Sequence, residues 1–187
     1  MKKADRVLLL VLAVSLFANV ALTVRLQHNR VAYLSNLQEQ FDARALPHAG
    51  ARLDELHLLG VDGKDSDLKF DSRALPVIAY VLSPKCKWCE LNRPNVDSLA
   101  SQVRGKYRII GISTTPDGLK SYQADNAIPF PLYYVDPKTT HAGFPLQVTP
   151  ETLVFSSEGV FLRGWSGAYV GETKGIVSAF FGVTLPR

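Results

Sequence analysis

An almost continuous apolar run, LPVIAYVLS at residues 75–83, ends just before the first cysteine of the chain. A run this rich in β-forming side chains is typical of a central strand that is buried on both faces. The two cysteines of the 187-residue chain, Cys86 and Cys89, follow at once in the segment PKCKWCELNRP. A helix is expected from there to about residue 103, with four apolar side chains available to face a core: Leu91, Val96, Leu99 and Val103. A buried strand that leads two cysteines to the start of a helix constrains the fold more than any other feature.

The remaining patterns alternate between strands and helices. In chain order, they predict a hairpin over 55–70 with its turn at Asp62-Gly63, a buried strand over 107–113, a helix that starts at Thr115 and Pro116, a short strand over 131–135, a hairpin over 152–165 with its turn at Glu158-Gly159, and a final helix over 171–183. This order predicts an α/β sandwich around a mixed sheet.

The N-terminal segment 7–24, VLLLVLAVSLFANVALTV, carries no charge. As a helix it would reach about 27 Å, close to the hydrocarbon thickness of a bilayer. It is longer than the apolar region of a usual signal peptide and lacks a clear cleavage site, so we expect an uncleaved transmembrane anchor. The domain organisation is then a cytoplasmic N-terminus at 1–6, the anchor, a stalk or linker at 25–50, and a folded domain at 51–187.

The bulk composition narrows the function. The net charge is +4, but the basic residues are scattered, and no basic stripe is interleaved with aromatic side chains, which argues against nucleic-acid binding. Two cysteines in close succession close only a tiny loop, so a disulfide between them would stabilise the fold little.

Four interpretations of the cysteine pair compete. A c-type haem attachment needs histidine directly after the second cysteine, where this chain has Glu90. A structural zinc site needs about four ligands, and the chain has no second cysteine pair and no histidine at ligand spacing. A structural disulfide would contribute little. The fourth interpretation is a redox dithiol.

The placement of the pair favours the redox dithiol. At a helix N-terminus the unpaired backbone amides and the helix dipole favour a thiolate at Cys86. Cys89 lies one turn further along the same helix, close enough to attack a mixed disulfide formed at Cys86. Lys85 and Lys87 flank the first cysteine and would add to the effect, although solvent screens them.

Over about residues 52–182 the chain resembles the membrane-anchored, thioredoxin-like disulfide oxidoreductases of the TlpA/ResA type. Three separated features carry the resemblance: Cys86-Lys87-Trp88-Cys89 after a strand, Pro94 five residues beyond the second cysteine, and the segment VTPETLVFSSEGVFLRGWSG. In that segment Thr149-Pro150 matches the cis-proline site of the family. The stretch between 113 and 148 is similar to the extra strand and helix of TlpA-like members. The implied fold is a thioredoxin-like α/β/α sandwich with an N-terminal transmembrane helix.

The resemblance implies roles for individual residues. Cys86 would be the attacking nucleophile and Cys89 the resolving thiol, with no cofactor or metal beyond their redox-active disulfide. Thr149 and Pro150 would lie against them and bind an extended substrate segment through exposed backbone. Trp88 is either an apolar platform for the partner or packed against the domain. Pro94 is expected to kink the active-site helix near the site.

Two positions depart from the family. Thioredoxins carry a buried Asp six residues before the first cysteine, where this chain has Tyr80, and several ResA-like members carry a Glu where it has Asn92. The proton acceptor for the second cysteine is therefore open, with Glu90 and Glu151 as weak candidates. His141 is expected to be a surface or capping residue.

The resemblance further implies a single-pass protein of a bacterial inner membrane, with its catalytic domain on the periplasmic side. Its partners would be protein thiols or disulfides and a membrane or periplasmic redox protein, in the maturation of cytochrome c or of other periplasmic enzymes. One alternative is a peroxiredoxin-type peroxidase, because Ser83 places a hydroxyl three residues before Cys86. The other is a non-catalytic thioredoxin-fold module for binding or metal delivery.

Overall fold

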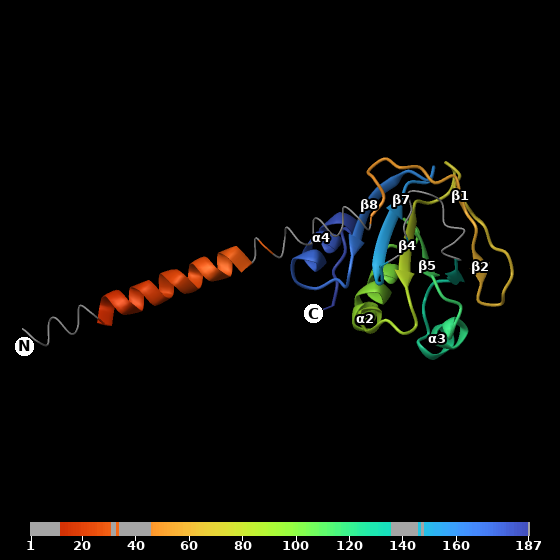
Figure 1. The fold of residues 1–187 in the computed structure, drawn as a ribbon. Helices are drawn as coiled ribbons and strands as arrows, with labels where there is room; N and C mark the ends of the chain where they lie inside the picture. The colour runs from red at the N-terminus through yellow and green to blue at the C-terminus, as the bar shows by residue number, and fades with distance from the viewer. Residues whose placement is uncertain (1–11, 31–32, 34–45, 136–145, 147, 187) are drawn as a thin grey trace, which may run out of the picture. The chain divides into compact units, whose positions relative to one another are not determined.

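The chain divides into two units, Met1–Phe41 and Asp42–Arg187. The structure, a computed structural model, describes residues 12–30, 33, 46–135, 146 and 148–186. In the first unit residues 12–30 form a helix (Figure 1). Across the described residues, no helix combines the length and the apolar character that a membrane crossing requires. Residues 7–11 of the predicted anchor, and most of the predicted stalk before residue 46, lie outside the described part.

The second unit is built on a six-stranded mixed sheet in the order β2-β6-β5-β4-β7-β8 (Figure 1). Its strands are β2 (Leu59–Gly60), β4 (Val77–Leu82), β5 (Arg108–Ser113), β6 (Leu132–Tyr134), β7 (Glu151–Phe155) and β8 (Phe161–Ser166). Strands β4, β5 and β6 are parallel, whereas β7 is antiparallel to β4, β8 to β7, and β2 to β6. Every residue of β4 is buried, which confirms the central strand predicted from the apolar run.

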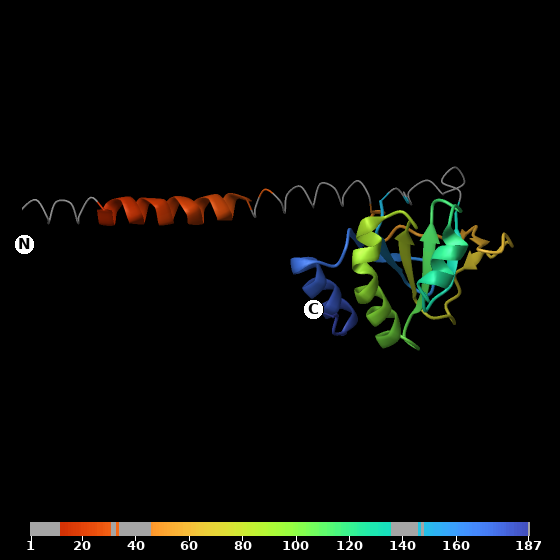
Figure 2. The ribbon, with the colours of Figure 1, turned by 90° about the horizontal axis from the view of Figure 1, so that it is seen from below.

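Three helices pack on one face of this sheet: α2 (Lys87–Gln102), α3 (Leu119–Asp125) and α4 (Gly171–Phe181) (Figures 1 and 2). Alternate residues of β4, namely Ile78, Tyr80 and Leu82, point into the core beneath them. Val96, Leu99 and Val103 join that core as predicted. Leu91 does not, because 56% of its surface is exposed. It lies on the solvent side of α2, so its predicted core position is wrong.

The opposite face of the sheet is covered differently. Val77, Ala79 and Val81 of β4 pack there against a small hairpin of β1 (Glu55–Leu56) and β3 (Leu68–Lys69). Among the described residues, this face carries no helix. The mixed sheet with helices is therefore confirmed, and the described layer on the second face is formed by the hairpin.

Two predicted elements differ in detail. The helix after β5 begins at Leu119 behind Gly118, whose φ is +73°, and not at Thr115. The hydroxyl of Thr115 instead accepts a hydrogen bond from the Asp117 N–H at 3.3 Å, which forms a turn before the helix. The segment 55–70 turns at Gly63 as predicted, but its arms are divided between two sheets because β1 pairs with β3 and β2 pairs with β6.

Candidate active site

Cys86 is the N-cap of α2. Its Sγ accepts a hydrogen bond from the backbone N–H of Cys89 at 3.2 Å, in the way that a capping side chain satisfies a free amide of the first turn. Its thiol donates to the carbonyl oxygen of Thr149 at 3.4 Å. The sulfur is half-buried and lies at the positive end of the helix dipole. The backbone therefore offers a hydrogen-bond donor to a negative charge at this atom.

Cys89 occupies a different environment three residues later. Only 1% of its surface is exposed, and it belongs to the core beneath α2. Burial raises the pKa of the Cys89 thiol to about 12, and the hydrogen bond with Cys86 raises it further in the same direction. Both cysteines are free thiols. The pair thus consists of a partly accessible sulfur at the helix end and a buried sulfur that stays protonated near neutral pH.

The Thr149–Pro150 peptide bond is cis, which agrees with the expectation from the resemblance. It lies directly before β7, and its position is held by a hydrogen bond from the Gly167 N–H to the Pro150 carbonyl at 2.7 Å. Because Cys86 contacts the Thr149 carbonyl, the fold brings these segments together although they are far apart in the sequence.

The other predicted site residues lie on the surface of α2. Trp88 lies in the first turn of α2. Its side chain is 58% exposed, so it is not packed into the domain. Pro94 lies inside α2, which extends without interruption from Lys87 to Gln102. Glu90, a candidate proton acceptor, is exposed on α2, whereas Cys89 is buried.

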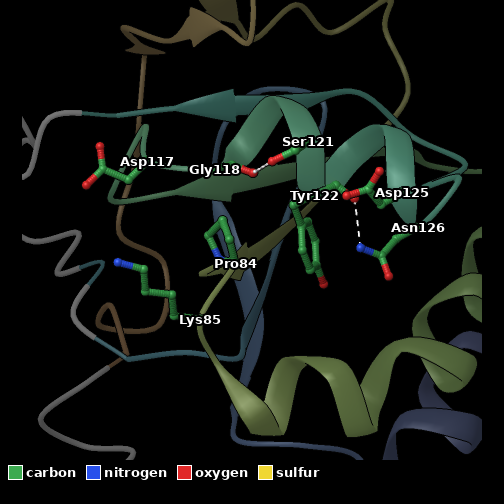
Figure 3. A pocket seen from close by; sticks show the side chains of 8 residues that line it. All are labelled: Pro84, Lys85, Asp117, Gly118, Ser121, Tyr122, Asp125 and Asn126. Carbon is green, nitrogen blue, oxygen red and sulfur yellow. Dashed lines mark hydrogen bonds between the residues drawn. The ribbon is translucent and has the colours of Figure 1, made fainter.

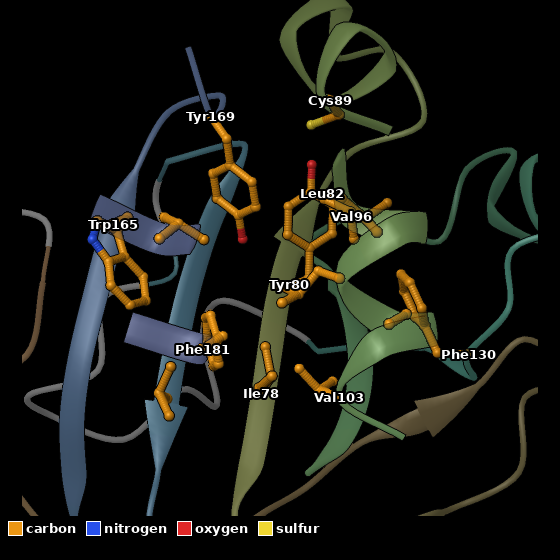
Figure 4. Close-up of a cluster of buried hydrophobic side chains, with 14 of the residues drawn as sticks. Ile78, Tyr80, Leu82, Cys89, Val96, Val103, Phe130, Trp165, Tyr169 and Phe181 are labelled. Carbon is orange, nitrogen blue, oxygen red and sulfur yellow. The ribbon is translucent and has the colours of Figure 1, made fainter. Parts of the chain in front are cut away.

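The two positions that depart from the family contact each other. Asn92 has no exposed surface, and its Nδ2 donates to the hydroxyl oxygen of Tyr80 at 3.5 Å. Figure 4 shows the Tyr80 hydroxyl directed towards the sulfur of Cys89. Desolvation raises the pKa of Tyr80 far above its usual range, and the neighbouring Cys89 adds to that increase. Tyr80 is therefore a neutral phenol under all ordinary conditions.

Asn92 also connects the active-site helix to the segment after β8. Its Oδ1 accepts hydrogen bonds from the backbone N–H of Tyr169 at 2.8 Å and from Nδ2 of Asn95 at 3.2 Å. The Tyr169 hydroxyl, in turn, hydrogen-bonds with Thr152 of β7. These groups are all buried and uncharged. No sequence pattern predicts this network, because its members come from four separate segments.

Glu151 faces away from Cys89. It pairs in register with Val81, and Val81 packs on the hairpin side of the sheet. There Glu151 accepts a hydrogen bond from Ser166 Oγ at 3.4 Å. Since neighbouring strands direct paired residues to the same face, Glu151 lies on the opposite side of the sheet from Cys89 and does not take its proton. His141 lies outside the described residues.

An open cleft of about 460 Å³ adjoins the cysteine loop (Figure 3). It lies between the segment before Cys86 and the length of α3, and it is lined by Pro84, Lys85, Asp117, Gly118, Ser121, Tyr122, Asp125 and Asn126. At its far end, the guanidinium of Arg93 donates to Asn126 at 3.0 and 3.2 Å. The lining is polar and carries both signs of charge. Within the described ranges, no three His, Cys, Asp or Glu side chains lie close enough together to hold a metal ion.

Solved structures resemble this domain in fold. A protein of Chlorobium tepidum provisionally named thiol:disulfide interchange protein DsbE aligns with a TM-score of 0.61 and 12% identity, over 73% of this chain and 97% of that one. The thioredoxin domain of a thiol-disulfide oxidoreductase from Bacteroides vulgatus aligns with a TM-score of 0.55 and 16% identity, over 71% and 97%. The peroxidoxin BcpB of Mycobacterium tuberculosis aligns with a TM-score of 0.54 and 17% identity, over 72% and 94%.

The domain therefore has a thioredoxin-like fold, and its structural neighbours include thiol-disulfide oxidoreductases. No family model matches the chain, and no curated protein matches it in sequence.

Proposed function

We propose that this protein is a thiol-disulfide oxidoreductase that acts on protein disulfides through Cys86 and Cys89. The observation that carries the proposal is the position of Cys86 Sγ, which lies at a helix N-terminus between the Cys89 N–H and the Thr149 carbonyl. A sulfur in this position is accessible, is offered a donor for its negative charge, and has a second thiol one helical turn away.

The reaction follows from this arrangement. The Cys86 thiolate attacks one sulfur of a substrate disulfide, a bond from Cys86 to that sulfur forms, and the other substrate sulfur leaves as a thiolate. Cys89 then loses its proton and attacks Cys86 Sγ, which releases the second substrate sulfur and forms the Cys86–Cys89 disulfide. Two electrons pass from the dithiol to the substrate, and the reverse sequence oxidises a substrate dithiol.

Substrate binding would use the surface around Cys86. An extended segment of the substrate would pair with the backbone at Thr149 and Pro150, and the exposed Trp88 would provide an apolar contact beside the attacking sulfur. The cleft beside Lys85 extends this surface towards α3.

We further propose that the domain is membrane-anchored and extracytoplasmic, with residues 7–24 as the anchor. Two arguments support this proposal. The segment is uncharged and long enough to span a bilayer, and exported proteins are the ones that form disulfides, so an anchored dithiol would lie close to its substrates. The partners would be protein disulfides or thiols and a membrane or periplasmic redox protein, with maturation of cytochrome c or other periplasmic enzymes as the setting. Fractionation tests the location, because a soluble full-length protein would contradict the anchor.

Trapping tests the activity. In the Cys89→Ser variant the mixed disulfide cannot be resolved, so we expect proteins that stay disulfide-linked to Cys86 and are released by reductant. The double variant Cys86→Ser/Cys89→Ser is the matched control and should trap nothing. If Cys89→Ser accumulates no more adducts than the control, thiol-disulfide exchange is not the function. A double variant that retains full function would favour a non-catalytic binding or metal-delivery module.

A peroxidase is the second candidate, favoured by Ser83 before Cys86 and by the fold shared with peroxidoxin BcpB. It predicts that the purified protein consumes hydroperoxide in the presence of a thiol donor, and that a Cys86 sulfenic acid forms first. Rapid exchange with protein disulfides in the absence of hydroperoxide turnover would exclude it.

A further inference from the structure

We propose that the Tyr80 hydroxyl, oriented by Asn92, is a hydrogen-bond donor that stabilises the Cys89 thiolate when this residue attacks the mixed disulfide. The inference rests on the proposed function. At the same site it assigns a donor role to Tyr80 and a positioning role to Asn92. It concerns the second half of the reaction, in which Cys89 must become an anion in a dry environment.

The orientation of Asn92 fixes the direction of the hydrogen bonds. The backbone N–H of Tyr169 can only donate, so the Asn92 atom that it contacts at 2.8 Å is the carbonyl oxygen. The amide nitrogen of Asn92 therefore points to Tyr80, and the phenol oxygen accepts from it at 3.5 Å. A phenol oxygen that accepts in this way keeps its own hydrogen available for another partner.

The hydroxyl group of Tyr80 faces Cys89 (Figure 4). Tyr80 is 3% exposed. Among the described residues, the Tyr80 hydroxyl makes one hydrogen bond, in which its oxygen accepts from Asn92. A buried O–H without an acceptor costs free energy. Figure 4 shows the hydroxyl and the Cys89 sulfur directed towards each other across the core. A thiolate at Cys89 would be a much stronger acceptor than the thiol, so the hydrogen bond gains most of its strength in the reacting state.

Tyr80 is not the only polar group near Cys89. Hydrogen bonds with the backbone at Ser83 and with the Thr149 side chain also lower the pKa of Cys89, although burial outweighs them. Tyr122 of α3 and Tyr169 after β8 are the other titratable side chains near Tyr80. Burial raises the pKa of Tyr122, and Cys89 adds to that increase, so Tyr122 also lies within the electrostatic reach of the sulfur. The Tyr169 hydroxyl is already paired with Thr152.

The proton of Cys89 follows a defined course in this scheme. Cys89 first gives its proton to water. Its thiolate then attacks Cys86 Sγ, the Cys89 Sγ–Cys86 Sγ bond forms while the bond from Cys86 to the substrate sulfur breaks, and the departing substrate thiolate takes up a proton from water. Tyr80 keeps its own proton throughout and donates only a hydrogen bond. It therefore lowers the energy of the attacking anion without acting as a base.

The two steps are separable with an aromatic disulfide that releases a coloured thiolate. The first equivalent of colour reports attack by Cys86, and the second reports attack by Cys89. In full-length protein, Tyr80→Phe should leave the first step within about twofold and slow the second about tenfold or more, because a hydrogen bond to a charged group is lost. Tyr169→Phe is the matched control, because it removes a buried phenol hydroxyl that does not face Cys89, and its second step should stay near that of the wild type.

Replacing Tyr80 by a difluorotyrosine provides a second test, because this substitution keeps the hydroxyl group and leaves no cavity. The fluorinated phenol is a stronger donor of similar shape, so it should accelerate the second step. The inference is overturned if Tyr80→Phe releases the second equivalent as fast as the wild type, if both steps slow equally, or if difluorotyrosine leaves the second step unchanged. A wild-type protein that releases neither equivalent would instead overturn the proposed function.

Discussion

Raising the pH should destabilise the dithiol form of this protein through one buried thiol. The pKa of Cys89 is raised from 9.0 to about 12, mainly by burial. Between these values the native state holds the proton and the unfolded chain releases it, so the native state binds more protons. The free energy of unfolding therefore falls as the pH rises through this window, and the contribution is fully present below pH 9.

The size of the effect follows from the shift. Each pKa unit corresponds to about 1.4 kcal/mol, so the full loss from Cys89 approaches about 4 kcal/mol at the upper end of the window. Halfway through it, near pH 10.5, the expected loss is about 2 kcal/mol. This is a large share of the net stability of an ordinary domain, which is about 5–15 kcal/mol.

Urea unfolding of the reduced protein measures this loss. The free energy of unfolding is determined near pH 8 and near pH 10.5 for the wild type and for Cys89→Ser, which lacks the titrating thiol. The raised pKa values of Tyr80 and Tyr169 contribute in both proteins and cancel in the comparison. The wild type should lose about 2 kcal/mol more than the variant over this interval. Equal losses in the two proteins would refute the assignment of Cys89 as a neutral, desolvated thiol.

Three further substitutions test other contacts. Asn92→Ala should cost about 3 kcal/mol in urea unfolding, because the buried Tyr169 N–H loses its acceptor and a cavity remains; a cost below about 1 kcal/mol would contradict this role. Gly159→Ala should reduce the free energy of unfolding by more than about 2 kcal/mol and so lower the midpoint of thermal unfolding, because φ is +81° and a Cβ would collide with the Leu53 carbonyl. An unchanged midpoint would show that the turn relaxes freely. Trp88→Ala should leave stability nearly unchanged and slow reduction of a protein disulfide about fivefold, while a small aromatic disulfide reacts as before; equal slowing of both substrates would argue against a docking role.

The parts of the site that the sequence predicted are those determined by local patterns. A continuous apolar run identifies a strand buried on both faces, and Cys86 follows it at the point where a helix must begin. The cis form of the Thr149–Pro150 bond was implied by the resemblance to the TlpA/ResA type, and it is present. The start of the helix after β5 was predicted too early, because Thr115 caps a turn and not the helix. Serine, threonine and proline are common at both kinds of position, so composition does not separate them.

Contacts between distant segments could not be predicted from the sequence. Glu151 directly follows the cis-proline and so appears close to the cysteines, yet the register of β7 against β4 turns its side chain to the other face of the sheet. A one-residue step in a strand reverses the direction of the side chain. Nearness along the chain therefore gave the wrong side of the sheet for this carboxylate.

The two departures from the family are coupled, and the coupling gives them a meaning that neither has alone. Position 80 lacks a carboxylate, and so does position 92, but in the structure the amide of Asn92 contacts the phenol of Tyr80 beneath Cys89. A carboxylate at either place would bring a charge, and a proton acceptor, into a core that is otherwise dry. The neutral pair offers a fixed hydrogen instead. Cys89 must then become an anion without a carboxylate at either position to take its proton, and the rate of that second step should depend on the donor strength of one buried hydroxyl.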